Sequence, residues 1–445
     1  MSSTEQLPRP DQRPRRRLRA PARRPVRGAA ARAERTLGAI AEGRLGTLPV
    51  SLSFWDGSVL PAPDPDAPSI VIREPSALAY LLHAPGQVGL GRAWVSGAID
   101  VDGDLEAVLA ARGHFEAAQL SRRDRARVAL EALRAAGPRV LVRPPVPASE
   151  ARTGGRLHSL LRDRAAIRHH YDVSNRFYEL LLGPSMVYSC AYFEDPSDPL
   201  EVAQERKLEL ICRKLRLQPG ERLLDIGCGW GSLLLHAAEH HGVRGVGVTL
   251  SGAQAELARE RIRAAGLADR VEVRVLDYRE LGDGPFDKIA SVGMYEHVGR
   301  SELARYVEHV HTLLRPGGLF LNHGIARLRS APPDGDTFIS RYVFPDGELH
   351  PVTDVIGALE AAGLEVRDVE SLREHYPPTL RRWGDNLARN RAAAIAEAGT
   401  ERERVWRLYM LGSALSFEAG EITVYQVLSA RDGAPHGLPL ARAAL

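Results

Sequence analysis

Three glycines at alternate positions follow a short apolar run in the middle of the chain. The apolar run occupies residues 223–226, and the glycines after it are Gly227, Gly229 and Gly231. In open α/β sheets, a glycine turn after a strand lets backbone N–H groups approach a ligand at the carboxyl edge of the sheet. The spacing is G-x-G-x-G rather than G-x-G-x-x-G, and the next apolar run ends at Thr249 without an acid that could bind a ribose. The loop therefore disfavours a dinucleotide.

The whole turn, DIGCGWG at residues 225–231, resembles the S-adenosylmethionine site of class I methyltransferases. A later strand-like run, residues 271–277, ends next to Tyr278, where an adenine ring would lie in such a site. The resemblance implies S-adenosylmethionine as the cofactor.

Three further motifs surround this loop in order along the chain. They are HYDVSNRFY at residues 170–178, YSCAYF at 188–193 and GMYEHVG at 293–299. Together they resemble the cyclopropane-fatty-acyl-phospholipid synthase family and the related mycolic acid cyclopropane synthases, over about residues 160–430. Residues 89–105 resemble the corresponding front segment of the bacterial phospholipid enzymes.

The resemblance implies that a methylene unit passes from S-adenosylmethionine to the double bond of an unsaturated phospholipid acyl chain, which becomes a cyclopropane. It places cofactor contacts at ten positions: Tyr188, Ser189, Asp225, Gly227, Gly229, Thr249, Leu250, Gln254, Asp277 and Tyr278. It also places a catalytic bicarbonate among five residues: Cys190, Glu296, His323, the backbone of Ile325, and Tyr376.

The expected reaction makes demands that these residues can meet. Attack of an alkene on the sulfonium methyl leaves a carbocation, which needs a dry pocket with aromatic faces such as Tyr376 and Tyr171. Ring closure then removes a methyl proton, with bicarbonate as the general base and Glu296 either accepting from its hydroxyl or protonated itself.

Three alternatives stay open beside ring formation. The cation could instead yield a methylene-branched chain that feeds a separate reductase. Plant alkaloid N-methyltransferases share much of the motif set, so a small-molecule amine is the second alternative. A non-catalytic membrane or nucleic-acid binder is the third, and the complete set of matched residues argues against it.

Two segments depart from the family pattern. Residues 321–325 read LNHGI where many relatives have a Leu-His-Thr-Ile run, and Pro377 and Pro378 follow Tyr376. Both departures are expected at the substrate pocket. We expect Glu296 to follow the fourth strand of the sheet and His323 to end the fifth, so that both side chains reach the edge that carries the glycine loop.

The elements that position these residues alternate between short apolar runs and amphipathic helical ones from about residue 165 onward. This pattern predicts a doubly wound, Rossmann-like α/β methyltransferase sheet behind a smaller N-terminal α+β domain. The expected divisions are a basic arm at 1–28, an α+β domain at 29–139, a linker at 140–160, a methyltransferase domain at 161–432 with a helical insertion near 380–415, and a tail at 433–445.

The 445 residues carry a formal net charge of +3, but the charge is unevenly spread. Residues 1–27 hold nine arginines and two acids, so this arm carries +7 and the remaining chain −4. Such an arm is attracted to anionic lipid headgroups. We expect peripheral contact with an anionic membrane rather than nucleic-acid binding, and a homodimer stays open.

Three cysteines cannot form a disulfide framework, and no stretch of about 20 apolar residues could span a membrane. A cytoplasmic, peripherally membrane-associated protein is therefore expected. His169, His170, His240 and His241 lie close together only in sequence, and the expected reaction needs no metal, so no metal ligands are predicted.

Overall fold

The computed structural model describes residues 27–41, 48–112, 122–151, 162, 170, 173–328 and 335–441. These residues form two sheets, one of four strands and one of seven. The basic arm before residue 27 lies outside the described residues.

The small sheet belongs to the front part of the chain and has the order β2-β1-β3-β4. Its strands are β1 (Ser51–Phe54), β2 (Val59–Leu60), β3 (Ser69–Ile72) and β4 (Ile99–Asp102). The helices of this part are α1 (Gly28–Ala41), α2 (Ser76–His83), α3 (Gln87–Val95), α4 (Leu105–Ala110) and α6 (Arg122–Ala136). Tyr80 of α2 and Ala93 of α3 pack with Ile99 in one buried cluster.

The large sheet has the order β10-β11-β9-β8-β5-β6-β7. Its strands are β5 (Arg222–Ile226), β6 (Arg244–Thr249), β7 (Val271–Val275), β8 (Phe286–Val292), β9 (Leu314–Arg327), β10 (Leu364–Ser371) and β11 (Ile422–Arg431). The five strands β5 to β9 are parallel, and β11 runs antiparallel between β9 and β10. The predicted doubly wound sheet is confirmed. Its order reverses between β5 and β8, where such sheets bind ligands.

Helices cover both faces of the large sheet because its strands are apolar on both sides. Helices α9 (Leu200–Lys214), α10 (Ser232–His240) and α11 (Gly252–Ala264) share one buried cluster with the sheet. Helices α12 (Leu303–Leu313) and α14 (Val352–Ala361) share the cluster on the other face. The sequence did not predict α14 or β10.

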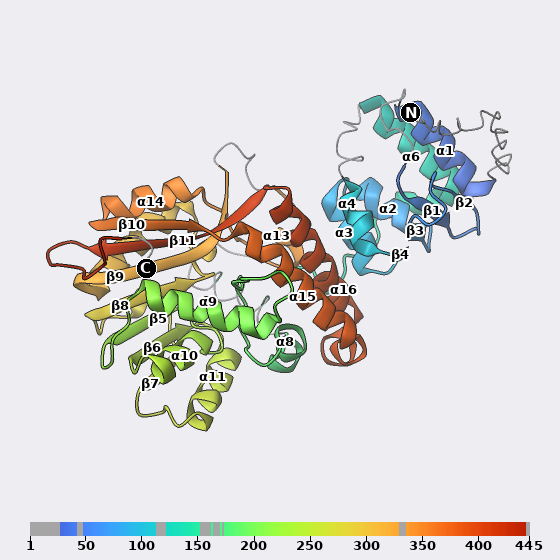
Figure 1. Cartoon of the computed structure of the whole chain (residues 1–445). Coiled ribbons are helices and arrows are strands. Elements are labelled where there is room, and N and C mark those ends of the chain that lie inside the picture. Colours follow the sequence, from blue (N-terminus) through green and yellow to red (C-terminus); the bar gives the residue numbers. More distant parts are fainter. Residues whose placement is uncertain are drawn as a thin grey trace, which may run out of the picture.

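A helical layer separates the large sheet from the front part of the chain (Figure 1). It contains α8 (Asn175–Leu182), α13 (Phe338–Tyr342), α15 (Tyr376–Arg389) and α16 (Arg391–Glu418). Arg404 of α16 joins the parts: its guanidinium donates to the carbonyls of Trp94 (2.6 Å) and Ile99 (2.6 Å) and stacks on the Trp94 ring.

The segment expected as a linker also docks into the structure. Glu150 is buried and accepts from Arg92 of α3 at 2.6 and 2.7 Å and from the Tyr342 hydroxyl of α13 at 3.0 Å. In the described part of the chain, no helix is long and apolar enough to cross a membrane.

Candidate active site

The glycine loop after β5 opens one side of a pocket at the carboxyl edge of the sheet. Gly227 (φ +81°) and Gly229 (φ +53°) hold backbone conformations that side chains disfavour. The backbone N–H groups of Gly227 and Cys228 donate to the Val248 carbonyl at the end of β6, at 2.9 and 3.1 Å. The loop is thereby folded back against β6.

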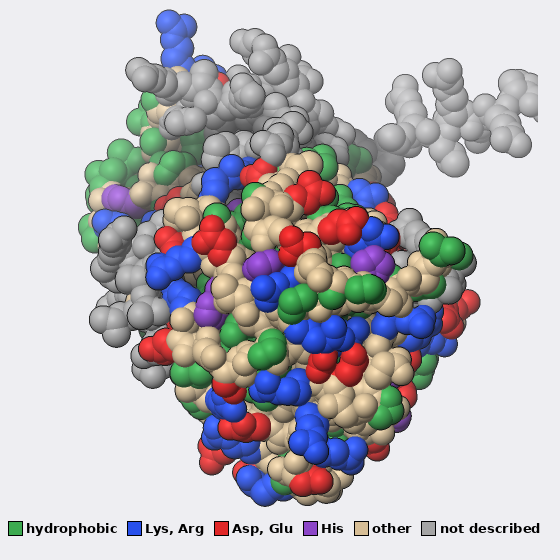
Figure 2. All heavy atoms as spheres, turned by 90° about the vertical axis from the view of Figure 1, so that its left-hand side faces the viewer, with side chains coloured by type: hydrophobic (Ala, Val, Ile, Leu, Met, Phe, Trp, Pro, Cys, Tyr) green, Lys and Arg blue, Asp and Glu red, His purple; other side chains and the backbone are tan. Residues whose placement is uncertain are grey.

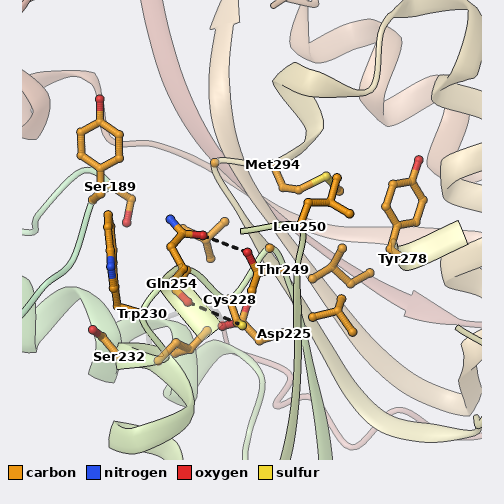
Figure 3. Close-up of a pocket in the computed structure, with 18 of the residues that line it drawn as sticks. Ser189, Asp225, Cys228, Trp230, Ser232, Thr249, Leu250, Gln254, Tyr278 and Met294 are labelled. Carbon is orange, nitrogen blue, oxygen red and sulfur yellow. Dashed lines mark hydrogen bonds between the residues drawn. The ribbon is translucent and has the colours of Figure 1, made fainter. Parts of the chain in front are cut away.

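All ten residues predicted to contact the cofactor line this one pocket, whose cavity volume is about 150 Å³. Figure 3 shows Ser189 and Trp230 at one end, Tyr278 at the other, and Gln254 and Thr249 between them. The Thr249 hydroxyl donates to Gln254 Oε1 at 2.8 Å, which fixes the Gln254 amide.

The HYDVSNRFY motif supports the pocket from behind. The Ser174 hydroxyl caps α8 by accepting from the Phe177 N–H at 3.0 Å. Asn175 accepts from Trp230 Nε1 at 2.8 Å and donates to the Ala253 carbonyl at 2.9 Å. One side chain therefore holds both the glycine loop and the start of α11.

A buried carboxyl and a buried amine lie at the floor of the pocket. Burial raises the pKa of Asp225 to about 7, and its Oδ1 has no hydrogen-bond partner among the described residues. Burial lowers the pKa of Lys207 to about 8, and its Nζ donates to the Ser189 hydroxyl at 2.8 Å. Each charge stabilises the other, so the pair brings both signs into a dry site.

Sequence reasoning missed Lys207 and its neighbour Gln204. Gln204 Nε2 donates to the Ser189 carbonyl at 3.0 Å, so both side chains of α9 hold the loop that carries Ser189 and Cys190. Both sit at buried positions of the helix. Gln204 and Lys207 are polar residues on the apolar face of an amphipathic helix, and this pattern could have indicated a buried polar site.

The five predicted catalytic residues do not line the pocket wall, although their neighbours Met294 and His297 do. The Ile325 N–H donates to Glu296 Oε1 at 2.7 Å, while Glu296 Oε2 is buried without a partner among the described residues. Burial raises the pKa of Glu296 to about 7. This carboxyl can therefore exchange a proton near neutral pH.

His323 lies two residues before Ile325 on β9, so both side chains leave the same face of the strand. Its Nδ1 lies 3.2 Å from Gln426 Nε2, which makes Nδ1 the acceptor, and its Nε2 is buried without a partner in the described structure. Burial lowers its pKa to about 3, so the ring is neutral with the proton on Nε2.

Cys190 and Tyr376 belong to the buried cluster against which Ile325 packs. Cys190 Sγ donates to the carbonyls of Ala191 (3.3 Å) and Leu372 (3.7 Å), and burial keeps it a thiol by raising its pKa. Tyr376 stacks on Phe417 at a centroid distance of 4.4 Å and meets the edge of Trp383. The structure thus joins Glu296 directly to Ile325, and Cys190 and Tyr376 to the same apolar cluster.

Two expectations about β9 are wrong. His323 does not end the strand, because β11 pairs with β9 as far as Arg327 and extends it beyond Val292, the end of β8. Asn322 does not face the site, because neighbouring residues of a strand point to opposite faces and His323 takes the other one. Tyr171, the second predicted aromatic face, lies outside the described residues.

The missing side chain at Gly324 has a structural reason. A Cβ there would lie 1.8 Å from Tyr295 Cε1. The Tyr295 ring fills that space, and its hydroxyl donates to the Ile325 carbonyl at 2.7 Å. Glycine at position 324, which departs from the family pattern, therefore leaves room for the ring of Tyr295, the residue before Glu296.

Comparison with known proteins agrees with this geometry. Residues 158–427 match the family model of mycolic acid cyclopropane synthetase. The chain belongs to this family. As a member of it, the chain is an S-adenosylmethionine-dependent methyltransferase, as the resemblance implied.

Full-length relatives and a solved structure extend this family match. The chain is 41% identical over 403 residues to the probable fatty acid methyltransferase of Pseudomonas putida, covering 89% of this chain and 95% of that protein. It is 39% identical over 295 residues to the cyclopropane-fatty-acyl-phospholipid synthase of Escherichia coli, covering 65% and 74%. The structure of mycolic acid cyclopropane synthase CmaA1, complexed with SAH and CTAB, is 34% identical with a TM-score of 0.57, covering 60% of this chain and 98% of that one.

Proposed function

We propose that this methyltransferase acts on the double bond of an unsaturated fatty acyl chain of a phospholipid and closes a cyclopropane ring. The observation that carries the proposal is that Glu296 Oε2 and His323 Nε2 are both buried without a hydrogen-bond partner in the described part of the chain, while their neighbour Ile325 packs against an aromatic cluster. Buried polar atoms without partners are costly, so such a pair indicates a bound group.

S-adenosylmethionine supplies an electrophilic methyl group on a sulfonium. The pocket suits it because the glycine loop brings the backbone close, and because the pair of Asp225 and Lys207 presents a carboxylate in a dry setting. The ten lining residues hold and orient the cofactor, and orientation is the main catalytic contribution that an enzyme makes to alkene attack.

A bicarbonate ion, if bound, supplies the base that removes the methyl proton. The donor set fits an anion of this shape: Glu296 Oε2 can accept from its hydroxyl, and His323 Nε2–H can donate to its oxygens, whereas the Cys190 thiol has to leave the Ala191 and Leu372 carbonyls to donate. The Ile325 N–H, which the resemblance assigned to bicarbonate, donates here to Glu296. For Ile325 to contact the anion, Glu296 has to release this bond.

The carbocation requirement favours an alkene over an amine. Tyr188 lies 5.3 Å from Trp383, and Tyr376 lies 4.4 Å from Phe417, measured between ring centroids. These faces stabilise a cation electrostatically without attacking it. Methylation of an amine releases a proton from nitrogen rather than from the transferred methyl, and it forms no carbocation that these faces would have to stabilise.

The product lipid tests the proposal. We express the full chain in a bacterium without an enzyme of this kind, extract its phospholipids and record proton NMR spectra. Upfield ring-methylene signals are expected. Vinylidene signals would instead show the methylene-branched product, which keeps the same site and would feed a reductase.

The matched variant in this experiment is His323→Ala. We expect it to lower turnover by about 100-fold or more while cofactor affinity, measured by calorimetry, stays the same, because His323 serves proton removal. Parallel loss of affinity and turnover would move His323 into the cofactor subsite. Unchanged lipids with methylated amines in the extract would overturn the lipid substrate.

A further inference from the structure

Helices α9 and α10 bring four side chains with metal-ligand chemistry together on the sheet face behind the cofactor pocket. Glu209 and Cys212 lie three residues apart on α9 and so share a face of the helix. His236 lies on α10, and His241 is the residue that caps its carboxyl end. Of these four, the sequence analysis considered only His241, and there as a residue without a metal.

The ligand atoms of Cys212, His236 and His241 all lie within 4.8 Å of one another. Both imidazoles also contact the same carboxylate oxygen: Glu209 Oε2 lies 3.1 Å from His236 Nε2 and 3.0 Å from His241 Nε2. Two imidazoles and one thiol therefore lie close together, and the Glu209 carboxylate adjoins both imidazoles.

This set matches the preferences of Zn²⁺ in type and number. Zinc in proteins takes four ligands from cysteine sulfur, histidine nitrogen and carboxylate oxygen. Ligand distances of about 2.0–2.3 Å around a tetrahedral ion require ligand atoms ~3.3–3.6 Å apart. The ligand atoms of Cys212, His236 and His241, which lie up to 4.8 Å apart, have to move closer together on binding.

Burial and helix direction also suit a cation. Cys212 is fully buried, the side chains of His236 and His241 are 9% and 20% exposed, and Glu209 at 38% faces solvent. An ion can therefore enter past Glu209 and lose its water. The site lies near the carboxyl ends of both helices, where the helix dipoles favour positive charge.

Hydrogen bonding alone does not account for the cluster. The two bonds to Glu209 involve only the histidines and leave Cys212 Sγ out. A thiol adds little to such a network because it is a weak donor, whereas it is a preferred ligand of zinc.

We propose that Glu209, Cys212, His236 and His241 bind one Zn²⁺ ion that pins α9 to α10. On binding, Cys212 releases its proton to solvent, and each imidazole coordinates through Nε2 with its proton on Nδ1. Thiolate and carboxylate then balance the two charges of the ion. All four positions belong to the protein, so the site is structural. Ile211 of α9 and Leu233 of α10 line the cofactor pocket, whose wall this ion would brace.

Zinc affinity tests the proposal on the full chain, stripped of metal with a chelator and titrated with zinc against a chromophoric competitor. One zinc per chain is expected. His236→Ala, His241→Ala and Cys212→Ala should each weaken binding by more than about tenfold. The matched control is His240→Ala. The His240 ring centroid lies 4.5 Å from that of His236, but His240 is not one of the proposed ligands.

Cobalt and heat separate ligand loss from misfolding. Cobalt in the wild-type site should show a thiolate charge-transfer absorption that Cys212→Ala lacks. Zinc should raise the unfolding temperature of the wild type but not of His241→Ala, whose metal-free unfolding temperature should equal that of the metal-free wild type. The proposal is overturned if all variants bind zinc as tightly as the wild type does. It is also overturned if His240→Ala loses as much zinc affinity as the ligand variants.

Discussion

Burial sets the protonation states of the residues around Glu296. A carboxyl in an apolar site keeps its proton to higher pH, and an imidazole there loses its proton at lower pH. Glu296 therefore titrates near neutral pH while His323 stays neutral throughout the working range. Only the first of these two groups can make turnover depend on pH.

Glu296 gives a pH prediction for catalysis. Turnover should rise as pH increases through about 7, because the ionised carboxylate is the form that accepts a proton from the base. Glu296→Gln should lower turnover by about 100-fold or more and flatten this limb. The measurement is turnover against pH at saturating cofactor, for the wild type and for Glu296→Gln. If turnover of the variant still rises with pH near 7, the titrating group is not Glu296.

The same residue gives a prediction for stability with the opposite sign. The pKa of Glu296 rises from 4.5 in the unfolded chain to about 7 in the fold, so the folded state binds the extra proton between these values. Stability should therefore fall as pH rises through this window, by up to ~3 kcal/mol, and remain lower above it. Urea unfolding at both ends of the window, compared with Glu296→Gln, measures the difference. A variant with the same pH dependence as the wild type would contradict it.

At the scale of elements, β9 and the short turn that carries Glu296 are fitted to each other. β9 lacks a side chain at Gly324 where the Tyr295 ring packs, and the Tyr295 hydroxyl binds the next carbonyl of the strand. This contact fixes the position of the turn relative to His323 and Ile325.

Gly324→Ala tests that fit. The added methyl would overlap the Tyr295 ring, so we expect a loss of about 1–3 kcal/mol in unfolding free energy and a parallel fall in turnover as Glu296 shifts. The control is Gly357→Ala on the exposed side of α14, where no atom lies within 4 Å of the new Cβ. That change should be neutral or stabilising, since alanine favours a helix over glycine. Equal effects at the two positions would contradict the packing argument.

At the scale of the whole molecule, Arg404 of the helical layer makes one of the contacts with the front part of the chain. Arg404 is buried and binds two carbonyls and the Trp94 ring, whereas Arg407 lies over the same ring with 26% of its side chain exposed. Arg404→Met should lower the unfolding free energy by about 2–5 kcal/mol because it removes a charged donor from two carbonyls, of which Trp94 keeps the Gly97 N–H, and removes the guanidinium from the Trp94 ring. Arg407→Met should cost less than about 1 kcal/mol. Similar losses in urea unfolding would show that the contact with α16 does not depend on Arg404.

The basic arm, residues 1–27, gives a prediction about membrane binding by the whole chain. Figure 2 shows basic and acidic side chains interleaved over one face of the described molecule, whereas the sequence of the arm, residues 1–27, has nine arginines and two acids. Deleting residues 1–27 should weaken binding to phosphatidylglycerol vesicles at low salt, and the difference should shrink as salt rises. Phosphatidylcholine vesicles are the control. Equal binding by both chains to the anionic vesicles would leave the arm without this role.

Local patterns in the sequence determined the sheet and the cofactor pocket. The apolar run, the glycine loop and the residues after it are contiguous, so their spacing alone predicts the strand and turn that the structure has at β5 and at the start of α10. Of the ten positions that the resemblance implied, eight lie at or after the ends of β5, β6 and β7, which meet at one edge of the parallel sheet, and all ten line one pocket.

Tertiary structure alone decided which buried groups face one another. Lys207 reaches Asp225 and Ser189 because α9 packs across the sheet, and Cys212 meets His236 and His241 because α9 packs on α10. The pairing with β11 carried β9 past His323 as far as Arg327. Such contacts depend on burial and on side-chain direction across long sequence separations. Residue spacing along one chain contains neither.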